Sequence, residues 1–242
     1  MDELAWLGVI RHGESDGNVA AKRAEATGAE IVDIAIADAD VPLTATGREQ
    51  AAAVGRWLDT LPPGERPEIV VTSPYRRAQE TAEIAVANAW SAPGPYRLLV
   101  DERLRDRELG VLDRLTRQGV AARMPEEAER RRRLGRIYYR PPGGESWADV
   151  ALRLRAVLGD LRRDHRDRRV LLVAHEAVAY ILRYLVEGLT LTHLVELSGG
   201  SGLDNGSLTA WARSDGALKL VRCNDVGHLV DQGAPVTRQE EV

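Results

Sequence analysis

Short apolar runs that alternate with helix-like segments constrain the fold of this chain more than any other feature. Residues 4–10, 68–72 and 170–174 each have the length and composition of a buried strand. Segments with an apolar stripe at helical spacing lie between them, for example at 51–61 and 146–161. Strands that alternate with helices predict an α/β fold. We expect a three-layer α/β/α sandwich with a mostly parallel central sheet.

The turns and caps between these runs suggest where the other elements begin. Thr46 and Glu49 have the spacing of a capping box at the start of one helix, and Ser146 is placed to cap another. The other expected elements are strands near 96–100, 206–212 and 217–223 and helices near 15–26, 75–90 and 176–186.

The length of 242 residues fits one large domain with inserted segments. We expect a single domain over 1–242, with cap-like insertions near 19–42 and 111–142. The tail, 227–242, has no clear pattern and is expected to be irregular. Within the second insertion, the arginine run 130–133 is either an exposed helical face or part of a cap that attracts a polyanionic substrate.

Composition excludes several classes of partner. The net charge of −4 gives no reason to expect nonspecific nucleic-acid binding. No apolar run is long enough to span a bilayer, and the acidic start lacks the basic and apolar regions of a signal peptide. The one cysteine cannot form an intramolecular disulfide, so a reduced, cytoplasmic location is the expectation. No histidine or cysteine has metal-ligand spacing.

Chemically active side chains follow three of the expected strands directly. Arg11 and His12 follow the first strand, Ser73 and Arg77 the second, and His175 the strand at 170–174. Because the carboxyl ends of parallel strands meet at one edge of a sheet, these groups are expected to form one cationic pocket. Such a pocket suits a phosphoryl group. A neutral histidine can attack phosphorus, and a carboxylic acid must then protonate the leaving oxygen and later activate water.

These motifs resemble those of the histidine phosphatase superfamily, also called phosphoglycerate mutase-like. The ordered set spans roughly residues 4–210 and is highly specific. The matching motifs are Arg11-His12-Gly13-Glu14, then Asn18, the Ser73, Arg77, Ala78 and Thr81 set, Gly143-Gly144-Glu145-Ser146, and His175.

The resemblance implies a phosphoglycerate mutase-like fold and a role for each matched residue. It implies that His12 is the phosphorylated nucleophile. It also implies that Arg11, Arg77 and His175 bind phosphate, with assistance from Asn18. His175 thereby takes part in catalysis, and the resemblance implies neither a metal ion nor another cofactor.

The general acid is left with two candidates. The family motif Leu-x-Glu-x-x-x-Gly aligns with residues 104–110, and counting back from Gly110 places Asp106 at the acid position. Glu108 lies two residues away and would serve instead if the loop is shifted. The spacing favours Asp106.

The chain departs from the family pattern after the second histidine, where Glu176 stands in place of the usual glycine. This extra carboxylate either narrows the substrate range or tunes His175.

The leading hypothesis is therefore a phosphomonoesterase that hydrolyses a phosphorylated small molecule through a phosphohistidine. A cofactor-dependent phosphoglycerate mutase would use the same pocket, but residues 111–140 lack the tyrosine- and lysine-bearing segments expected of that subgroup. A noncatalytic domain that binds phosphorylated ligands or partner proteins is the alternative of another class. The sequence leaves the oligomeric state open, and a homodimer is one option.

Overall fold

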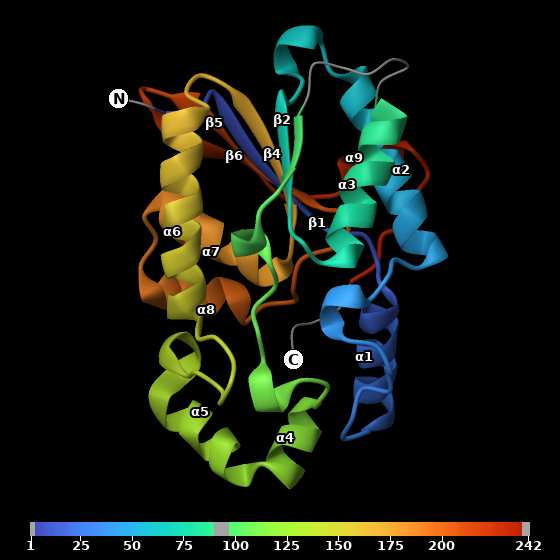
Figure 1. Ribbon diagram of the computed structural model, residues 1–242, viewed down its shortest axis with the longest axis vertical. Helices are drawn as coiled ribbons and strands as arrows, with labels where there is room; N and C mark the ends of the chain where they lie inside the picture. The colour runs from blue at the N-terminus through green and yellow to red at the C-terminus, as the bar shows by residue number, and fades with distance from the viewer. Residues whose placement is uncertain (1–2, 90–96, 239–242) are drawn as a thin grey trace.

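A six-stranded sheet forms the centre of the computed structural model, which describes residues 3–89 and 97–238 (Figure 1). The strand order is β3-β2-β4-β1-β5-β6. Only β5 runs against its neighbours, so the other five strands share one direction, and the predicted mostly parallel sheet is confirmed. The strands are β1 (Trp6–Arg11), β2 (Ile69–Thr72), β3 (Arg97–Val100), β4 (Arg169–Ala174), β5 (Leu208–Ser214) and β6 (Ala217–Asp225).

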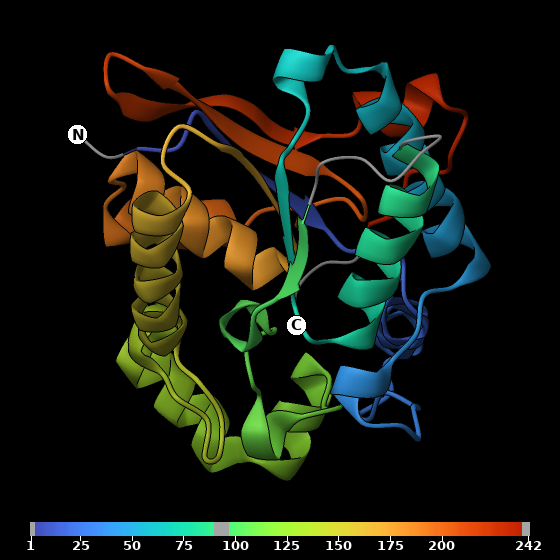
Figure 2. The same ribbon diagram turned by 45° about the horizontal axis from the view of Figure 1, so that its top comes forward.

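Helices cover both faces of the sheet and complete the predicted three-layer sandwich. In Figures 1 and 2, α6, α7 and α8 lie on one face and α2, α3 and α9 on the other, while α1, α4 and α5 lie toward one end. The α-helices are α1 (Asp16–Thr27), α2 (Ala45–Thr60), α3 (Arg76–Ala89), α4 (Arg117–Arg123), α5 (Pro125–Tyr138), α6 (Trp147–Asp164), α7 (Glu176–Glu187), α8 (Leu191–Ser198) and α9 (Gly227–Asp231). Short 3-10 helices are η1 (Asp38–Asp40), η2 (Pro63–Glu65), η3 (Glu102–Leu104) and η4 (Gly110–Leu112).

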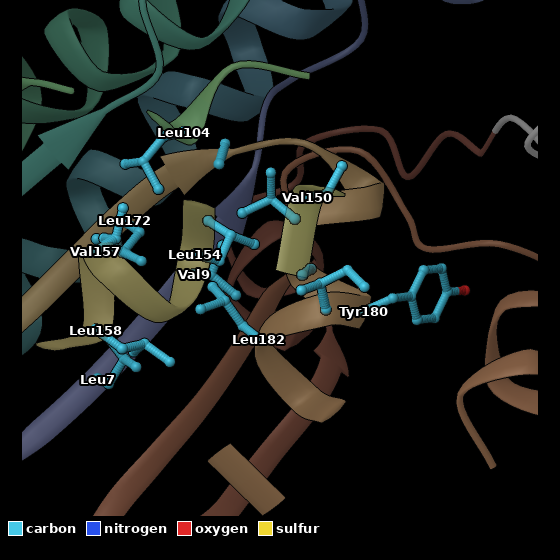
Figure 3. Close-up of a cluster of buried hydrophobic side chains, with 14 of the residues drawn as sticks. Leu7, Val9, Leu104, Val150, Leu154, Val157, Leu158, Leu172, Tyr180 and Leu182 are labelled. Atoms are coloured by element: carbon cyan, nitrogen blue, oxygen red, sulfur yellow. The ribbon is translucent and has the colours of Figure 1, made fainter. Parts of the chain in front are cut away.

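Alternating strand residues build two cores, one on each face of the sheet. Successive side chains of a strand point to opposite faces. Leu7 and Leu172 therefore enter the core beneath α6 and α7, whereas Ile10 and Val173 enter the core beneath α2 and α3. Figure 3 shows the first core, in which side chains of β1 and β4 meet those of α6 and α7; its labelled residues are Leu7, Val9, Leu104, Val150, Leu154, Val157, Leu158, Leu172, Tyr180 and Leu182.

The strand register brings three strand ends together. Arg11 of β1 pairs with Ala174 of β4, and Thr72 of β2 pairs with Val173 of β4. The residues that follow β1, β2 and β4 directly therefore leave the sheet at one edge. This arrangement confirms the predicted convergence and places the candidate site at the carboxyl ends of these strands.

Two local predictions differ from the structure. The N-cap of α2 is Thr44, whose hydroxyl accepts the Gly47 N–H at 3.0 Å, so the predicted capping box of Thr46 and Glu49 is wrong. Thr44 holds that place because its backbone N–H also donates to Glu14, which fixes the chain just before the helix.

The sequence predicted an irregular tail over 227–242, and this prediction is wrong for its first residues, which form α9. Leu229 of that helix is fully buried, which explains why this polar segment folds back onto the core beneath α2 and α3. Two ends of predicted elements, Trp90 and Tyr96, lie outside the described residues.

Candidate active site

His12 lies directly after β1 and is almost fully buried. Its Nδ1 lies 2.7 Å from the Gly13 carbonyl oxygen, so Nδ1 carries the proton and donates it there. The Nε2 lone pair faces Arg77, whose Nε donates to it at 3.3 Å. Burial, reinforced by the positive charge of Arg77, holds the pKa of His12 well below its ordinary value. His12 is therefore neutral near pH 7, with Nε2 available as a nucleophile.

His175 lies at the end of β4 and forms a matching neutral pair with His12. Its Nε2 is 2.7 Å from the hydroxyl of Ser73, which itself accepts the Tyr75 N–H at 3.2 Å. The Asp106 carboxylate, 3.3 Å from Nδ1, favours the tautomer with the proton on Nδ1, and in that tautomer the Ser73 hydroxyl donates to Nε2. Burial, with Arg77 nearby, holds the pKa of His175 well below its ordinary value. The two imidazole rings stand 5.2 Å apart at 61°.

Arg77 emerges from the first turn of α3 and is also buried. Its Nη1 donates to the backbone carbonyl and the carboxylate of Asp38, at 2.7 and 3.0 Å. Its Nη2 donates to the second carboxylate oxygen of Asp38 at 3.2 Å and to Asp106 at 3.1 Å. The guanidinium thus presents a fork of N–H donors beside His12, in the geometry that suits carboxylates and phosphates.

Arg11 is the last residue of β1, and its side chain is 5% exposed. Its Nη1 contacts the Leu203 carbonyl oxygen and lies 3.0 Å from the Glu176 carboxylate. Its Nε is buried and has no hydrogen-bond partner within residues 3–89 and 97–238. The Nδ1 of His175 likewise makes no hydrogen bond in the described part of the chain. Unsatisfied buried donors are costly, so an anion at this site would stabilise both.

These groups lie on or just behind a cavity of about 540 Å³. His12, Arg11 and Arg77 line it, whereas His175 lies fully buried beside His12. Its outer walls come from the two expected insertions, through Ala21, Val32, Ile34, Ile36, Ala37, Asp38, Ala39, Val41, Asp113, Arg114 and Leu115. The arginine run 130–133 is not among the lining residues, and Arg130 and Arg132 pair with neighbouring glutamates of α5.

The two candidate acids have different surroundings. Asp106 Oδ2 lies 3.1 Å from Arg77 Nη2 and 3.3 Å from His175 Nδ1. Glu108 instead accepts a hydrogen bond from the Tyr75 hydroxyl at 2.6 Å, and its side chain is 46% exposed against 29% for Asp106. Both residues line the cavity. Asp106 is thus the carboxylate in contact with the arginine and histidine of the site.

Asn18 and Glu176 are also placed in the lining. The Asn18 side chain forms a capping box with Ser15 at the start of α1, and its Oδ1 accepts from Asn205 Nδ2 at 3.1 Å. Glu176 pairs with Arg11, and its carboxylate also accepts the Leu203 N–H at 3.2 Å. The carboxylate that this chain has in place of the usual glycine therefore forms an ion pair with Arg11 of the site.

Sequence reasoning did not identify three residues that contact the site. Asp38 pairs with Arg77, Tyr75 holds Glu108, and Asn205 donates to both Asn18 and the His12 carbonyl oxygen. Tyr75 could have been found, since it stands between Ser73 and Arg77 in the motif. Asp38 and Asn205 lie in segments without a periodic hydrophobic pattern, so the sequence does not indicate toward which part of the fold their side chains point.

Comparison with protein families gives a match over residues 7–226 to the model of the histidine phosphatase superfamily (branch 1). The uncharacterised phosphatase PhoE of Bacillus subtilis is 30% identical over 79% of this chain and 77% of its own length. The 2,3-bisphosphoglycerate-dependent phosphoglycerate mutase 2 of Gloeobacter violaceus is 33% identical over 62% of this chain. That match spans 60% of the mutase, less than two thirds of its length.

Solved structures agree with this assignment. A mycobacterial glucosyl-3-phosphoglycerate phosphatase superimposes with a TM-score of 0.70 at 28% identity, covering 91% of this chain and 98% of that one. The same phosphatase in complex with inorganic phosphate gives a TM-score of 0.69 at 26% identity, with coverage of 93% and 99%. The family match therefore includes both phosphatases and a mutase, and the phosphatase structures share the fold of this chain.

Within residues 3–89 and 97–238, no group of three or more His, Cys, Asp or Glu side chains is placed to hold a metal ion. None of the helices in these two ranges has both the length and the apolar character needed to cross a membrane.

Proposed function

Because this chain belongs to the histidine phosphatase superfamily (branch 1), we propose that it is a phosphomonoesterase that works through a phosphohistidine at His12. One observation carries the proposal. A neutral, buried imidazole has its Nε2 beside Arg77. Two further buried donors, Arg11 Nε and His175 Nδ1, make no hydrogen bond in the described part of the chain, and the group that lies beside His175 Nδ1 is the Asp106 carboxylate at 3.3 Å. A phosphoryl group supplies both an electrophile for Nε2 and acceptors for these donors.

In the first step, His12 Nε2 attacks phosphorus in line with the ester oxygen. The N–P bond forms as the P–O bond breaks, and the leaving oxygen takes a proton from the carboxyl group of Asp106. Arg11, Arg77 and His175 hold the three equatorial oxygens, and Asn18 assists at the start of α1. The Gly13 carbonyl oxygen, which already accepts the Nδ1 proton, stabilises the positive charge that develops on the imidazole.

In the second step, water attacks the phosphohistidine and Asp106 takes its proton. The N–P bond breaks, inorganic phosphate leaves, and His12 returns to its neutral form. Asp106 is placed for both steps because it lines the cavity and its Oδ2 lies beside Arg77 and His175, two of the groups proposed to hold the phosphoryl oxygens. Glu108 is the alternative acid, held by Tyr75 at the more exposed side of the cavity.

Glu176 is proposed to act on specificity through Arg11, which it contacts at 3.0 Å. The segments 19–42 and 111–142 are proposed to form the cap that selects the alcohol portion of the substrate, because residues of both line the cavity.

A cofactor-dependent phosphoglycerate mutase is the second candidate, favoured by the 33% identity to the Gloeobacter violaceus mutase. It would keep the phosphoryl group from water and return it to the substrate. The two activities separate in one assay, with 3-phosphoglycerate and a bisphosphoglycerate primer. Isomer formation without phosphate release would identify the mutase.

The test of the proposed function is phosphate release from p-nitrophenyl phosphate and a metabolite panel by wild type and His12→Ala. We expect release by wild type and its loss in the variant. Release that survives the substitution would refute His12 as nucleophile. A folded wild type that binds phosphate but turns over no ester would instead favour the noncatalytic binding domain.

A further inference from the structure

Both arginines proposed to bind phosphate already hold a carboxylate. The fork of Arg77 is engaged in a bidentate manner by Asp38, at 3.0 and 3.2 Å. Arg11 is engaged by Glu176 at 3.0 Å. A carboxylate presents two oxygens to an arginine much as a phosphate does, so each acid occupies donors that the substrate needs.

Asp38 is placed so that it can leave Arg77. It begins η1, and its side chain is 49% exposed, whereas Arg77 is buried. The surrounding segment is fixed to other segments by Val32, whose N–H donates to Arg114, and by Pro42, which accepts from Asp16. Residues 33–41 lie between these two points. Among the described residues, their hydrogen bonds to other parts of the chain are those between Asp38 and Arg77. The departure of Asp38 therefore breaks no other hydrogen bond between the described part of this segment and the rest of the fold.

Ionisation of Asp38 is also costly in this position. Burial raises the pKa of its carboxyl group even though Arg77 lies beside it, and the neighbouring Asp106 acts in the same direction. Arg77 therefore does not bring the pKa of Asp38 below its ordinary value, as a firmly held ion pair would.

The cavity as a whole lacks the excess of positive charge in its lining that a polyanionic substrate would need. Its lining contains four arginines and five carboxylates, and His12 is neutral; the arginines are Arg11, Arg77, Arg107 and Arg114, and the acids are Asp38, Asp106, Glu108, Asp113 and Glu176. One substrate phosphoryl group is accommodated when it replaces Asp38 on Arg77. A second anionic group would face Glu108, Asp113 and Glu176 while the first already neutralises charge on Arg11 and Arg77, and like charges at close range repel.

We propose that Asp38 is a specificity-determining residue of this site, which competes with the phosphoryl group for Arg77 and excludes esters that carry a second anion. The preferred substrates are then phosphate monoesters of neutral or cationic alcohols. Apolar side chains of Val32, Ile34 and Ile36 line the same outer wall and suit the carbon skeleton of such an alcohol. This inference rests on the proposed function for the identity of the reaction, but its effect on phosphate affinity does not require turnover.

The first test is calorimetric titration of wild type and Asp38→Asn with inorganic phosphate. We expect the variant to bind phosphate at least about tenfold more tightly, because it loses a unit negative charge in contact with Arg77. Asp40→Asn is the matched control, since Asp40 lies on the same 3-10 helix and forms no ion pair within the described residues. We expect its affinity to stay within about twofold of wild type, as for an exposed charge outside the contact. Affinity in Asp38→Asn that equals or falls below that of wild type would overturn the proposal, as would an equal gain in Asp40→Asn.

The second test compares kcat/KM for two esters of similar size, glycerol 3-phosphate and 3-phosphoglycerate, which differ in a carboxylate. We expect wild type to prefer glycerol 3-phosphate by at least about tenfold, and Asp38→Asn to reduce that preference several-fold. Phosphoethanolamine, with a cationic alcohol, should be accepted at least as well as glycerol 3-phosphate. A wild-type preference for 3-phosphoglycerate, or an unchanged ratio in the variant, would contradict the proposal. If no ester is hydrolysed, the proposed function fails while the phosphate titration still decides the role of Asp38.

Discussion

Replacement of Asp106 by asparagine removes an ionisable carboxyl group and leaves the shape of the site nearly unchanged. Asp106 Oδ2 lies 3.1 Å from Arg77 Nη2 and 3.3 Å from His175 Nδ1, so the carboxylate shares the space of the catalytic groups. An amide keeps one oxygen for these contacts but can neither give a proton to the leaving oxygen nor take one from water. The substitution therefore removes proton transfer while it keeps the packing, and its loss of a charge beside Arg77 affects phosphate binding, which KM reports separately from kcat.

The expected loss is that of a general acid–base catalyst. Such a group contributes about 10²–10⁴-fold in rate. This corresponds to about 2.7–5.5 kcal/mol of the activation barrier. We expect kcat of Asp106→Asn on an alkyl phosphate such as glycerol 3-phosphate to fall by that factor. With p-nitrophenyl phosphate, whose leaving group needs no proton, the first step should survive and the second should be slow.

The assay follows nitrophenolate release in a stopped-flow instrument. Asp106→Asn should give a burst close to one equivalent per enzyme, followed by slow turnover, because the phosphohistidine forms but is not hydrolysed. Glu108→Gln is the matched control. Glu108 accepts one hydrogen bond from Tyr75 on the exposed side of the cavity, so its loss should reduce kcat less than about tenfold. Thermal melts of both variants verify that they fold.

The opposite pattern would refute this assignment. If Glu108→Gln loses more than a hundredfold while Asp106→Asn stays within about tenfold of wild type, the proton is handled by Glu108. The motif alignment that places Asp106 at the acid position would then be shifted by two residues.

Two stability measurements test the burial of the histidines and one close backbone approach. The pKa values of His12 and His175 are lower in the folded than in the unfolded chain, so the unfolded state binds more protons below about pH 6.5. As the pH is lowered below that value, the free energy of unfolding should fall by up to about 1.4 kcal/mol per pH unit for each histidine. Chemical denaturation from pH 7.5 to 5.5 measures this slope, and His175→Gln should reduce it; a slope that is flat in wild type would contradict the neutral histidines. Gly47→Ala should destabilise by about 1–3 kcal/mol, because its Cβ would lie 2.0 Å from the Glu14 carbonyl oxygen. Gly159→Ala, in a helix with open space around it, should instead stabilise by about 0.5–1 kcal/mol, and equal effects of the two alanines would contradict the close approach.

The sheet and the convergence of the site could be predicted because they depend on regular patterns. Buried strands such as β1 and β4 are continuous apolar runs, and parallel strands deliver the residues after them to one edge. His12, Ser73 and His175 therefore meet as predicted, and Arg77 follows on the helix that begins there.

The remaining contacts could not be predicted because they depend on irregular segments. Asp38 reaches Arg77 from a stretch with no periodicity, and its direction is set by where η1 folds back over the site. The role of Glu176 was equally open, since the sequence left a narrower substrate range and the tuning of His175 as alternatives; the structure pairs its carboxylate with Arg11. Threonines at 44 and 46 are both good caps, and the backbone contact of Thr44 with Glu14 decides between them.

The most direct test of the central claim is to trap the phosphoenzyme. Wild type is mixed with p-nitrophenyl phosphate, quenched in alkali within milliseconds, digested and analysed by mass spectrometry. Asp106→Asn, in which the intermediate should accumulate, serves as the positive control. We predict one phosphoryl group per chain, on the imidazole of His12 and attached through Nε2, and none in His12→Asn. A phosphorylated residue other than His12, or hydrolysis by wild type with no phosphoenzyme in either protein, would contradict the proposed reaction.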